Sequence, residues 1–170
     1  MWFKYSVIIL LFFTLFLLED SFLPFLGAMG AMLNPVFILF FILIFFDDNL
    51  NIFLTIVTAG FLLDLALPSY FGISIISLFV VFFLQKLIDY FFRKDDDKYL
   101  IFYFIITFSI NFIFYNLLLY LSLMVFSIES NLISNLTIGL IYNLIIACIG
   151  FYIYKLFVKE ARNKNQLKLI

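Results

Sequence analysis

The sequence predicts an all-α, polytopic membrane protein of six transmembrane helices, and two observations predict it. Of the 170 residues, 66% are hydrophobic and only 12% are charged, whereas a typical soluble domain carries about 25% charged residues. Apolar runs also recur at lengths near the roughly 20 residues that a helix needs to cross the hydrocarbon core. No soluble domain and no repeat is visible, so we expect residues 1–170 to form a single integral membrane domain.

Hydropathy divides the chain into six candidate spans. They are residues 2–18, 35–46, 50–67, 73–92, 99–126 and 134–158. The first span carries Lys4 near its start and so resembles a signal peptide, but no small-residue cleavage site follows it. We therefore expect an uncleaved first helix.

The segment between the first two spans is the least regular part of the chain. Residues 19–34 contain one proline and two glycines, so we expect them to lie at the membrane interface or to re-enter the protein, which must then cover their backbone. The second span opens with Pro35 at a favoured first helical position, capped by Asn34. Because twelve residues are short for a span, this helix is expected to include part of the preceding segment.

Charge asymmetry predicts the orientation, because loops retained in the cytoplasm are enriched in Lys and Arg. With an inside N-terminus, all ten basic residues fall in inside segments or at inner helix ends. The charged residues of the outside segments are all acidic, namely Glu19, Asp20 and Glu129. The prediction is a multi-pass protein of the cell membrane with both termini cytoplasmic. Residues 159–170 are then a basic cytoplasmic tail close to anionic membrane lipids.

Several functional classes are disfavoured by the residues present. The chain has no His, and its single Cys148 lies in an apolar run, so the common metal ligands and a disulfide framework are missing. The basic residues form short clusters and no basic face, which argues against binding to nucleic acid. An intramembrane aspartyl enzyme needs two carboxylates that share a proton, yet Asp64 and Asp89 are predicted at opposite membrane faces. We therefore expect no enzyme activity, no catalytic residue, no metal and no cofactor.

The stretch "GFLLDLALPSYFG", residues 60–72, is the main candidate site. Asp64 lies within the third span, about one turn from its outer end. Gly60 precedes it by four residues on the same helix face and permits a neighbouring helix to approach closely. Three interpretations of Asp64 stay open: helix packing or partner contact, which we favour, a ligand or ion site, and catalysis. Pro68 and Gly72 are expected to turn the chain into the next span.

Other polar residues within the spans also follow helical spacing. Asn143 belongs to a stripe of small and polar residues in the sixth span, namely Asn135, Gly139, Asn143 and Ala147. Such a stripe is typical of a packing face, because amides hydrogen-bond across membrane helices. Thr107, Asn111 and Tyr115 form a row in the fifth span, and Gln85 and Asp89 share a face in the fourth.

Together, the length, the six-span layout, the Gly60 to Gly72 motif and Asn143 in "GLIYNLIIA" resemble the MreD family of rod shape-determining membrane proteins. The family often has an Asp after the Pro that opens the second helix, whereas Val36 follows Pro35 here. The resemblance implies a non-enzymatic scaffold of the bacterial cell-elongation machinery that acts in peptidoglycan synthesis. Implied partners are the single-span protein MreC, the RodA glycan polymerase, a class B penicillin-binding protein and the MreB cytoskeleton.

The resemblance also supplies the main alternative function. The MreD family is similar in fold to the substrate-binding subunits of energy-coupling-factor vitamin transporters. Such a subunit needs an outer-face pocket with several convergent polar groups, and it often carries small residues spaced by four on its first helix for docking. The first helix here has Ser6 and Thr14 but no such face, which favours the scaffold.

Overall fold

The computed structural model of the chain describes residues 2–21, 33–46, 51–66, 72–92, 99–125 and 135–167. The elements in these ranges are α1 (Trp2–Ser21), α2 (Pro35–Phe46), α3 (Ile52–Ala66), α4 (Ile73–Phe92), α5 (Leu100–Val125), the π-helical turn η2 (Asn135–Gly139) and α7 (Leu140–Leu167). No strand occurs within these ranges, so the all-α class predicted from the sequence is confirmed for them.

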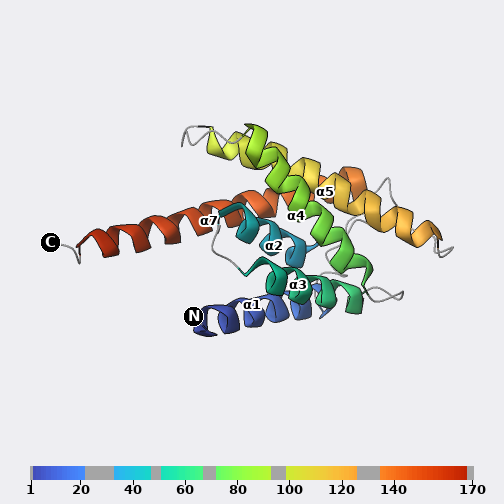
Figure 1. Cartoon of the computed structure of the whole chain (residues 1–170), viewed down its shortest axis with the longest axis horizontal. Coiled ribbons are helices and arrows are strands. Elements are labelled where there is room, and N and C mark those ends of the chain that lie inside the picture. The colour runs from blue at the N-terminus through green and yellow to red at the C-terminus, as the bar shows by residue number, and fades with distance from the viewer. Residues whose placement is uncertain are drawn as a thin grey trace.

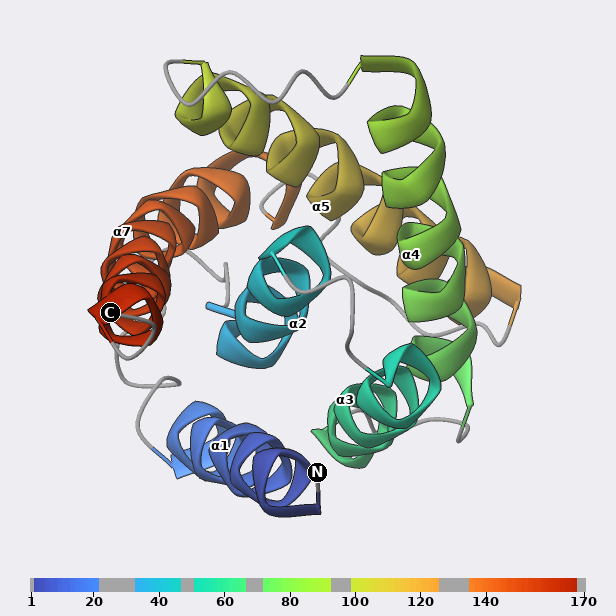
Figure 2. The same cartoon turned by 60° about the vertical axis from the view of Figure 1, so that its left-hand side comes forward.

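The short helix α2 lies in the middle of the bundle, with α1, α3, α4, α5 and α7 arranged around it (Figure 2). Ten of its 12 residues are buried. Its sequence, PVFILFFILIFF, is apolar on every side, which is typical of a helix enclosed by others and not of a surface helix with one apolar stripe. The other five helices can therefore pack around it on all sides.

The expectation that α2 includes part of the preceding segment is wrong. The helix begins at Pro35, and residues 33–34 are not helical. The predicted cap is confirmed: Phe37 N–H donates to Asn34 Oδ1 at 2.8 Å, and Ile38 N–H donates to the Asn34 main-chain oxygen at 3.1 Å. A full membrane-spanning length is needed only by a helix that faces lipid. Because protein surrounds α2, 12 residues suffice.

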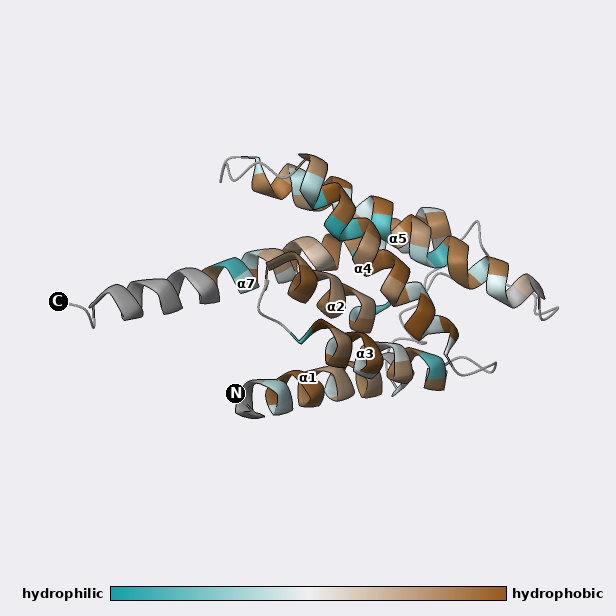
Figure 3. Ribbon diagram, viewed as in Figure 1, coloured by the Kyte–Doolittle hydropathy of each residue, from teal (hydrophilic) through white to brown (hydrophobic). Residues whose placement is uncertain are grey.

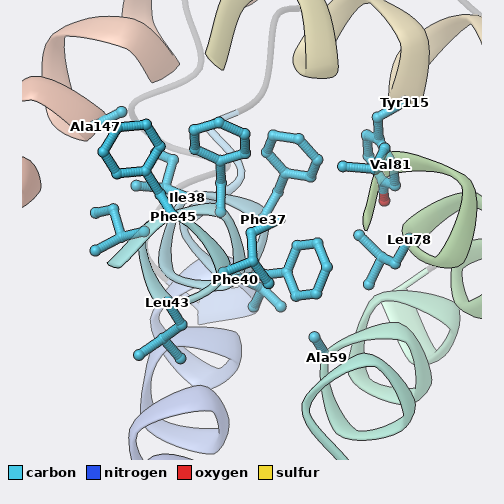
Figure 4. Packing of buried hydrophobic residues seen from close by; sticks show 14 of the residues in the cluster. Phe37, Ile38, Phe40, Leu43, Phe45, Ala59, Leu78, Val81, Tyr115 and Ala147 are labelled. Atoms are coloured by element: carbon cyan, nitrogen blue, oxygen red, sulfur yellow. The ribbon is translucent and has the colours of Figure 1, made fainter. Parts of the chain in front are cut away.

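Aromatic rings of α2 lie at the centre of the core (Figure 4). The ring of Phe37 lies 4.7 Å from that of Tyr115 on α5, and the ring of Phe45 lies edge-on to Phe104 at 5.1 Å. Edge-on and tilted pairs of this kind contribute about 0.5 to 1.5 kcal/mol beyond area burial. Buried residues of the neighbouring helices complete this core, among them Ala59, Leu78, Val81 and Ala147.

Three helical segments are long and apolar enough to cross a membrane: Ile73–Phe92, Leu100–Ser122 and Leu136–Leu156. Three shorter apolar segments accompany them, namely Tyr5–Leu18, Pro35–Phe46 and Ile52–Leu65. Exposed side chains of the outer helices are mostly large and hydrophobic, so the ribbon in Figure 3 is brown over most of the bundle. These features are compatible with a membrane protein.

The last helix differs from its predicted limits. The predicted span 134–158 begins with the π-helical turn η2 and continues as α7 without a break to Leu167. The first part of the predicted tail, residues 159–167, therefore continues the helix, which projects beyond the bundle at its C-terminal end (Figure 1).

Candidate functional site

Asp64, near the end of α3, binds the main chain at the start of α4. Its Oδ2 accepts a hydrogen bond from Gly72 N–H at 2.7 Å, and its Oδ1 accepts one from Ser74 N–H at 2.8 Å. The first N–H groups of any α-helix have no partner within the helix. A carboxylate from α3 thus caps the N-terminal end of α4. We call Asp64, Gly72 and Ser74 the Asp64 clasp.

Two glycines make this geometry possible. Gly72 has a φ of +104°, a conformation that residues with a side chain rarely adopt, and it directs its N–H to the carboxylate. Gly60 lies one turn before Asp64, where a Cβ atom would stand 2.7 Å from the Cα of Ile75. The two helices are therefore in backbone contact at Gly60, which brings the start of α4 within reach of Asp64.

The carboxylate of Asp64 is almost completely removed from solvent, since the residue is only 2% exposed. Burying a charge is expensive unless it is paired and hydrogen-bonded. Here both oxygens accept from main-chain amides, and the positive end of the α4 dipole adds favourable electrostatics. Because the carboxylate is shielded from solvent and each oxygen already accepts from a main-chain amide, Asp64 is poorly placed to act as a base, nucleophile or ion ligand.

Asn143, on α7, likewise binds the start of another helix, α2. Its Oδ1 accepts a hydrogen bond from Asn34 N–H at 2.8 Å, just before α2, and its Nδ2 donates to Gly139 O at 2.7 Å. Asn143 is fully buried. Farther along α7, a Cβ at Gly150 would meet the end of the Ile42 side chain at 2.6 Å, so this face of α7 packs closely on α2. We call the Asn143–Asn34 contact the Asn143 clasp.

A third polar group joins the other half of α4 to α5. Asn111 Nδ2 donates to Gln85 Oε1 at 2.8 Å, Gln85 Nε2 donates to Asp89 Oδ1 at 2.9 Å, and Tyr103 OH donates to the same oxygen at 2.6 Å. We call these four residues the α4–α5 chain. Asp64 and Asp89 are far apart, because α4 rises about 1.5 Å per residue between Ser74 and Asp89. They cannot share a proton.

The predicted site residues thus fall into two separate places. Gly60, Asp64 and Gly72 come together at the α3–α4 junction. Asn143, on α7, contacts the start of α2. Pro68 is outside the described residues. Sequence reasoning missed the target of Asn143 and the pairing of Gln85 with Asn111. The pairing of Gln85 with Asn111 could have been found from the sequence, because each of two adjacent spans has an amide side chain at a similar depth.

The described ranges contain no group of three or more His, Cys, Asp or Glu residues that could hold a metal ion. Within those ranges, the polar side chains with assigned partners bind helix ends, helix carbonyls or one another. The arrangement therefore fastens helices together. Comparison with protein-family models, with curated proteins and with solved structures finds no match to this chain.

Proposed function

We propose that the protein is a non-enzymatic membrane scaffold of the bacterial cell-elongation machinery, with a role like that of the MreD family. In this proposal it helps to maintain rod shape by binding an MreC-like single-span protein. RodA-type glycan polymerase, a class B penicillin-binding protein and the MreB cytoskeleton are further partners in the same assembly. The residues that suggested the family are Gly60, Asp64, Gly72 and Asn143.

The observation that carries the proposal is the Asp64 clasp. The main candidate for a functional group in the sequence, a carboxylate inside an apolar helix, is held by two main-chain amides. Intramembrane charges are functional candidates by default, but here the charge is used to fix one helix against the next. A protein whose buried polar groups hold helices together is suited to presenting a fixed surface to partners.

The proposal includes six crossings with both termini in the cytoplasm. The start of α1 and the end of α7 lie at the same end of the bundle (Figure 1), which is compatible with an even number of crossings. The shorter apolar stretches are compatible with this topology for different reasons. The stretch in α1 belongs to a helix of 20 residues, α2 is enclosed by protein, and α3 is accommodated by local thinning of the bilayer or by snorkelling end residues.

The alternative is a vitamin-binding subunit of an energy-coupling-factor type transporter, whose fold the MreD family resembles. That function needs polar side chains that are free to meet a solute at the outer end. Asp64 is the outer-end carboxylate that first suggested a solute site, and both of its oxygens are already bound. The scaffold is therefore the better supported of the two functions.

Depletion and co-purification in the native host test the proposal. We expect depletion to make rod-shaped cells round, and we expect an MreC-like protein to co-purify with the chain from native membranes. Normal shape after depletion, together with no recovery of elongation proteins, would contradict the scaffold. A vitamin retained through purification would instead support the transporter subunit.

Two glycine variants sharpen the test. Gly60→Ala introduces a methyl group into a backbone contact, whereas Gly150→Ala meets only the end of a flexible side chain. We expect Gly150→Ala to restore rod shape in depleted cells and Gly60→Ala to fail, with membrane levels of both variants measured by immunoblot. If Gly60→Ala restores shape at normal level, close α3–α4 packing is not needed for function.

A further inference from the structure

The α4–α5 chain contains a buried acceptor that the rest of the described structure leaves unused. Asn111 is fully buried, and its Oδ1 accepts no hydrogen bond from any residue in the described ranges. An unsatisfied buried acceptor costs about 1 to 3 kcal/mol. In a native structure such an atom needs an explanation.

The orientation of the Asn111 amide is fixed by its neighbours, so turning it over does not remove the problem. Its Nδ2 donates to Gln85 Oε1 at 2.8 Å and to Thr107 O at 2.8 Å. A flipped amide would place Oδ1 against two carbonyl oxygens. Gln85 is fixed in turn, because its Nε2 must face the carboxylate oxygen of Asp89.

The direction of the chain also makes Asn111 Oδ1 a strong acceptor. Every donor in it points towards Asp89: Tyr103 OH and Gln85 Nε2 donate to the carboxylate, and Asn111 donates to Gln85. Hydrogen bonds in such a chain polarise one another. The last acceptor, Asn111 Oδ1, therefore gains partial negative charge and favours a donor.

We propose that one water molecule is bound between α4 and α5 and donates a hydrogen bond to Asn111 Oδ1. A buried water needs two to four polar partners. Gln85 Oε1 can accept a second hydrogen bond, and Thr107 Oγ1, one turn before Asn111, donates to Tyr103 O and keeps its own lone pairs. Asn111 has no exposed surface, so any donor bound at its Oδ1 must be small, and water is the smallest.

The site extends the polar path from the end of α4 towards the middle of the bundle. Asp89 lies three residues before the end of α4, and Asn111 lies near the middle of α5. The water ends the chain at Asn111 and satisfies its buried oxygen. The inference does not depend on the proposed scaffold function, because it concerns only the pairing of α4 with α5.

Asn143 provides a matched internal control. Both asparagines are fully buried, and both donate from Nδ2 to the carbonyl four residues earlier, Asn111 at 2.8 Å and Asn143 at 2.7 Å. They differ at Oδ1, because the oxygen of Asn143 accepts from Asn34 N–H. A water signal at Asn111 alone would therefore report the unused acceptor and not burial or residue type.

Two measurements on the unmodified full-length protein in lipid test the site. Side-chain NMR of protein labelled at asparagine should show a dipolar cross-peak from water to the Asn111 amide and none to that of Asn143. An experimental density map that resolves ordered water should show a peak about 2.8 Å from Asn111 Oδ1. A dry Oδ1, or a protein donor at that position, overturns the proposal, as does an equal cross-peak at both asparagines.

Discussion

The two ends of α4 are fastened to the bundle by different kinds of polar contact. At its start, the Asp64 clasp joins a side chain of α3 to main-chain amides, and both carboxylate oxygens are used. In its second half, the α4–α5 chain joins side chains to one another, and an acceptor is left at Asn111. One helix thus carries a short contact to main-chain amides, beside which Ser74 Oγ has no partner among the described residues, and a longer chain of side chains that leaves Asn111 Oδ1 without one.

The difference concerns how each contact depends on sequence. Every residue except proline has a main-chain amide, so the Asp64 clasp depends on one carboxylate, on the close approach at Gly60 and on the positive φ of Gly72. The α4–α5 chain depends on several side chains at once, and changing any of them alters the partners of the next. We expect the first contact to respond steeply to single changes and the second to show coupled effects.

The largest effect is expected from Gly60→Ala, which separates α3 from α4. The new Cβ would lie 2.7 Å from the Cα of Ile75, and a backbone atom cannot move aside as a flexible side chain can. Overpacking of this kind costs about 1 to 3 kcal/mol and occasionally more. We expect a loss of about 3 kcal/mol in the free energy of unfolding, measured by denaturant titration in mixed micelles.

Gly150→Ala is the matched control for Gly60→Ala. Its Cβ would meet Ile42 Cδ1 at a similar distance of 2.6 Å, but that atom ends a flexible side chain. We expect a loss of less than about 1 kcal/mol after the isoleucine rotates. Equal losses for the two variants would show that the backbone contact at Gly60 is not what makes the α3–α4 junction sensitive to an added methyl group.

Asp64→Ala is expected to have the next largest effect. It leaves the N–H groups of Gly72 and Ser74 without their acceptor, and hydrogen bonds to a charged group contribute about 1.5 to 3 kcal/mol. We expect a loss of about 2 kcal/mol in the free energy of unfolding. Asp64→Asn keeps one acceptor and should lose about half as much. A loss near zero for both variants would mean that the clasp adds nothing to stability.

A double-mutant cycle on Gln85→Leu and Asn111→Leu tests the coupled character of the α4–α5 chain. Each single change leaves a buried partner unsatisfied, which costs about 1 to 3 kcal/mol, whereas the double change removes both groups. We expect the double variant to lose at least about 0.6 kcal/mol less than the sum of the single losses. The same cycle on Asp64→Ala and Asn143→Ala should be additive, because these residues share no hydrogen bond. Additivity in both cycles would remove the distinction between the two kinds of contact.

Hydropathy and local chemistry were enough to place most helices. Within the described ranges, the α-helices coincide with runs of apolar residues, and the Asn34–Pro35 pair marks the start of α2. The expected extension of α2 was wrong because the length rule for spans assumes contact with lipid, and whether a helix is enclosed depends on its neighbours. The π-helical turn η2 and the length of α7 also lay outside what hydropathy indicates.

For the candidate site, the sequence indicated which residues matter better than it indicated their partners. Helical spacing put Gly60 and Asp64 on one face, and that face does contact α4. The sequence placed Asn143 on a packing face but could not identify the main-chain amide of Asn34, 109 residues away, as its partner. Contacts of this kind depend on the order of helices around α2, which no local pattern encodes.

Asn143→Ala is expected to have a smaller effect than Asp64→Ala, and it tests whether a neutral clasp behaves like the charged one. Removing the amide takes one acceptor from Asn34 N–H at the start of α2. The loss should be about 1 kcal/mol, because Asn34 Oδ1 still caps Phe37 N–H and the bond to Asn143 is between neutral groups. The measurement is the same denaturant titration, with Asn116→Ala as control, since Asn116 bonds only to Phe112 O one turn earlier in its own helix among the described residues. If Asn143→Ala costs as much as Asp64→Ala, the charge of Asp64 adds nothing beyond a neutral acceptor, and the burial of the helix end accounts for both losses.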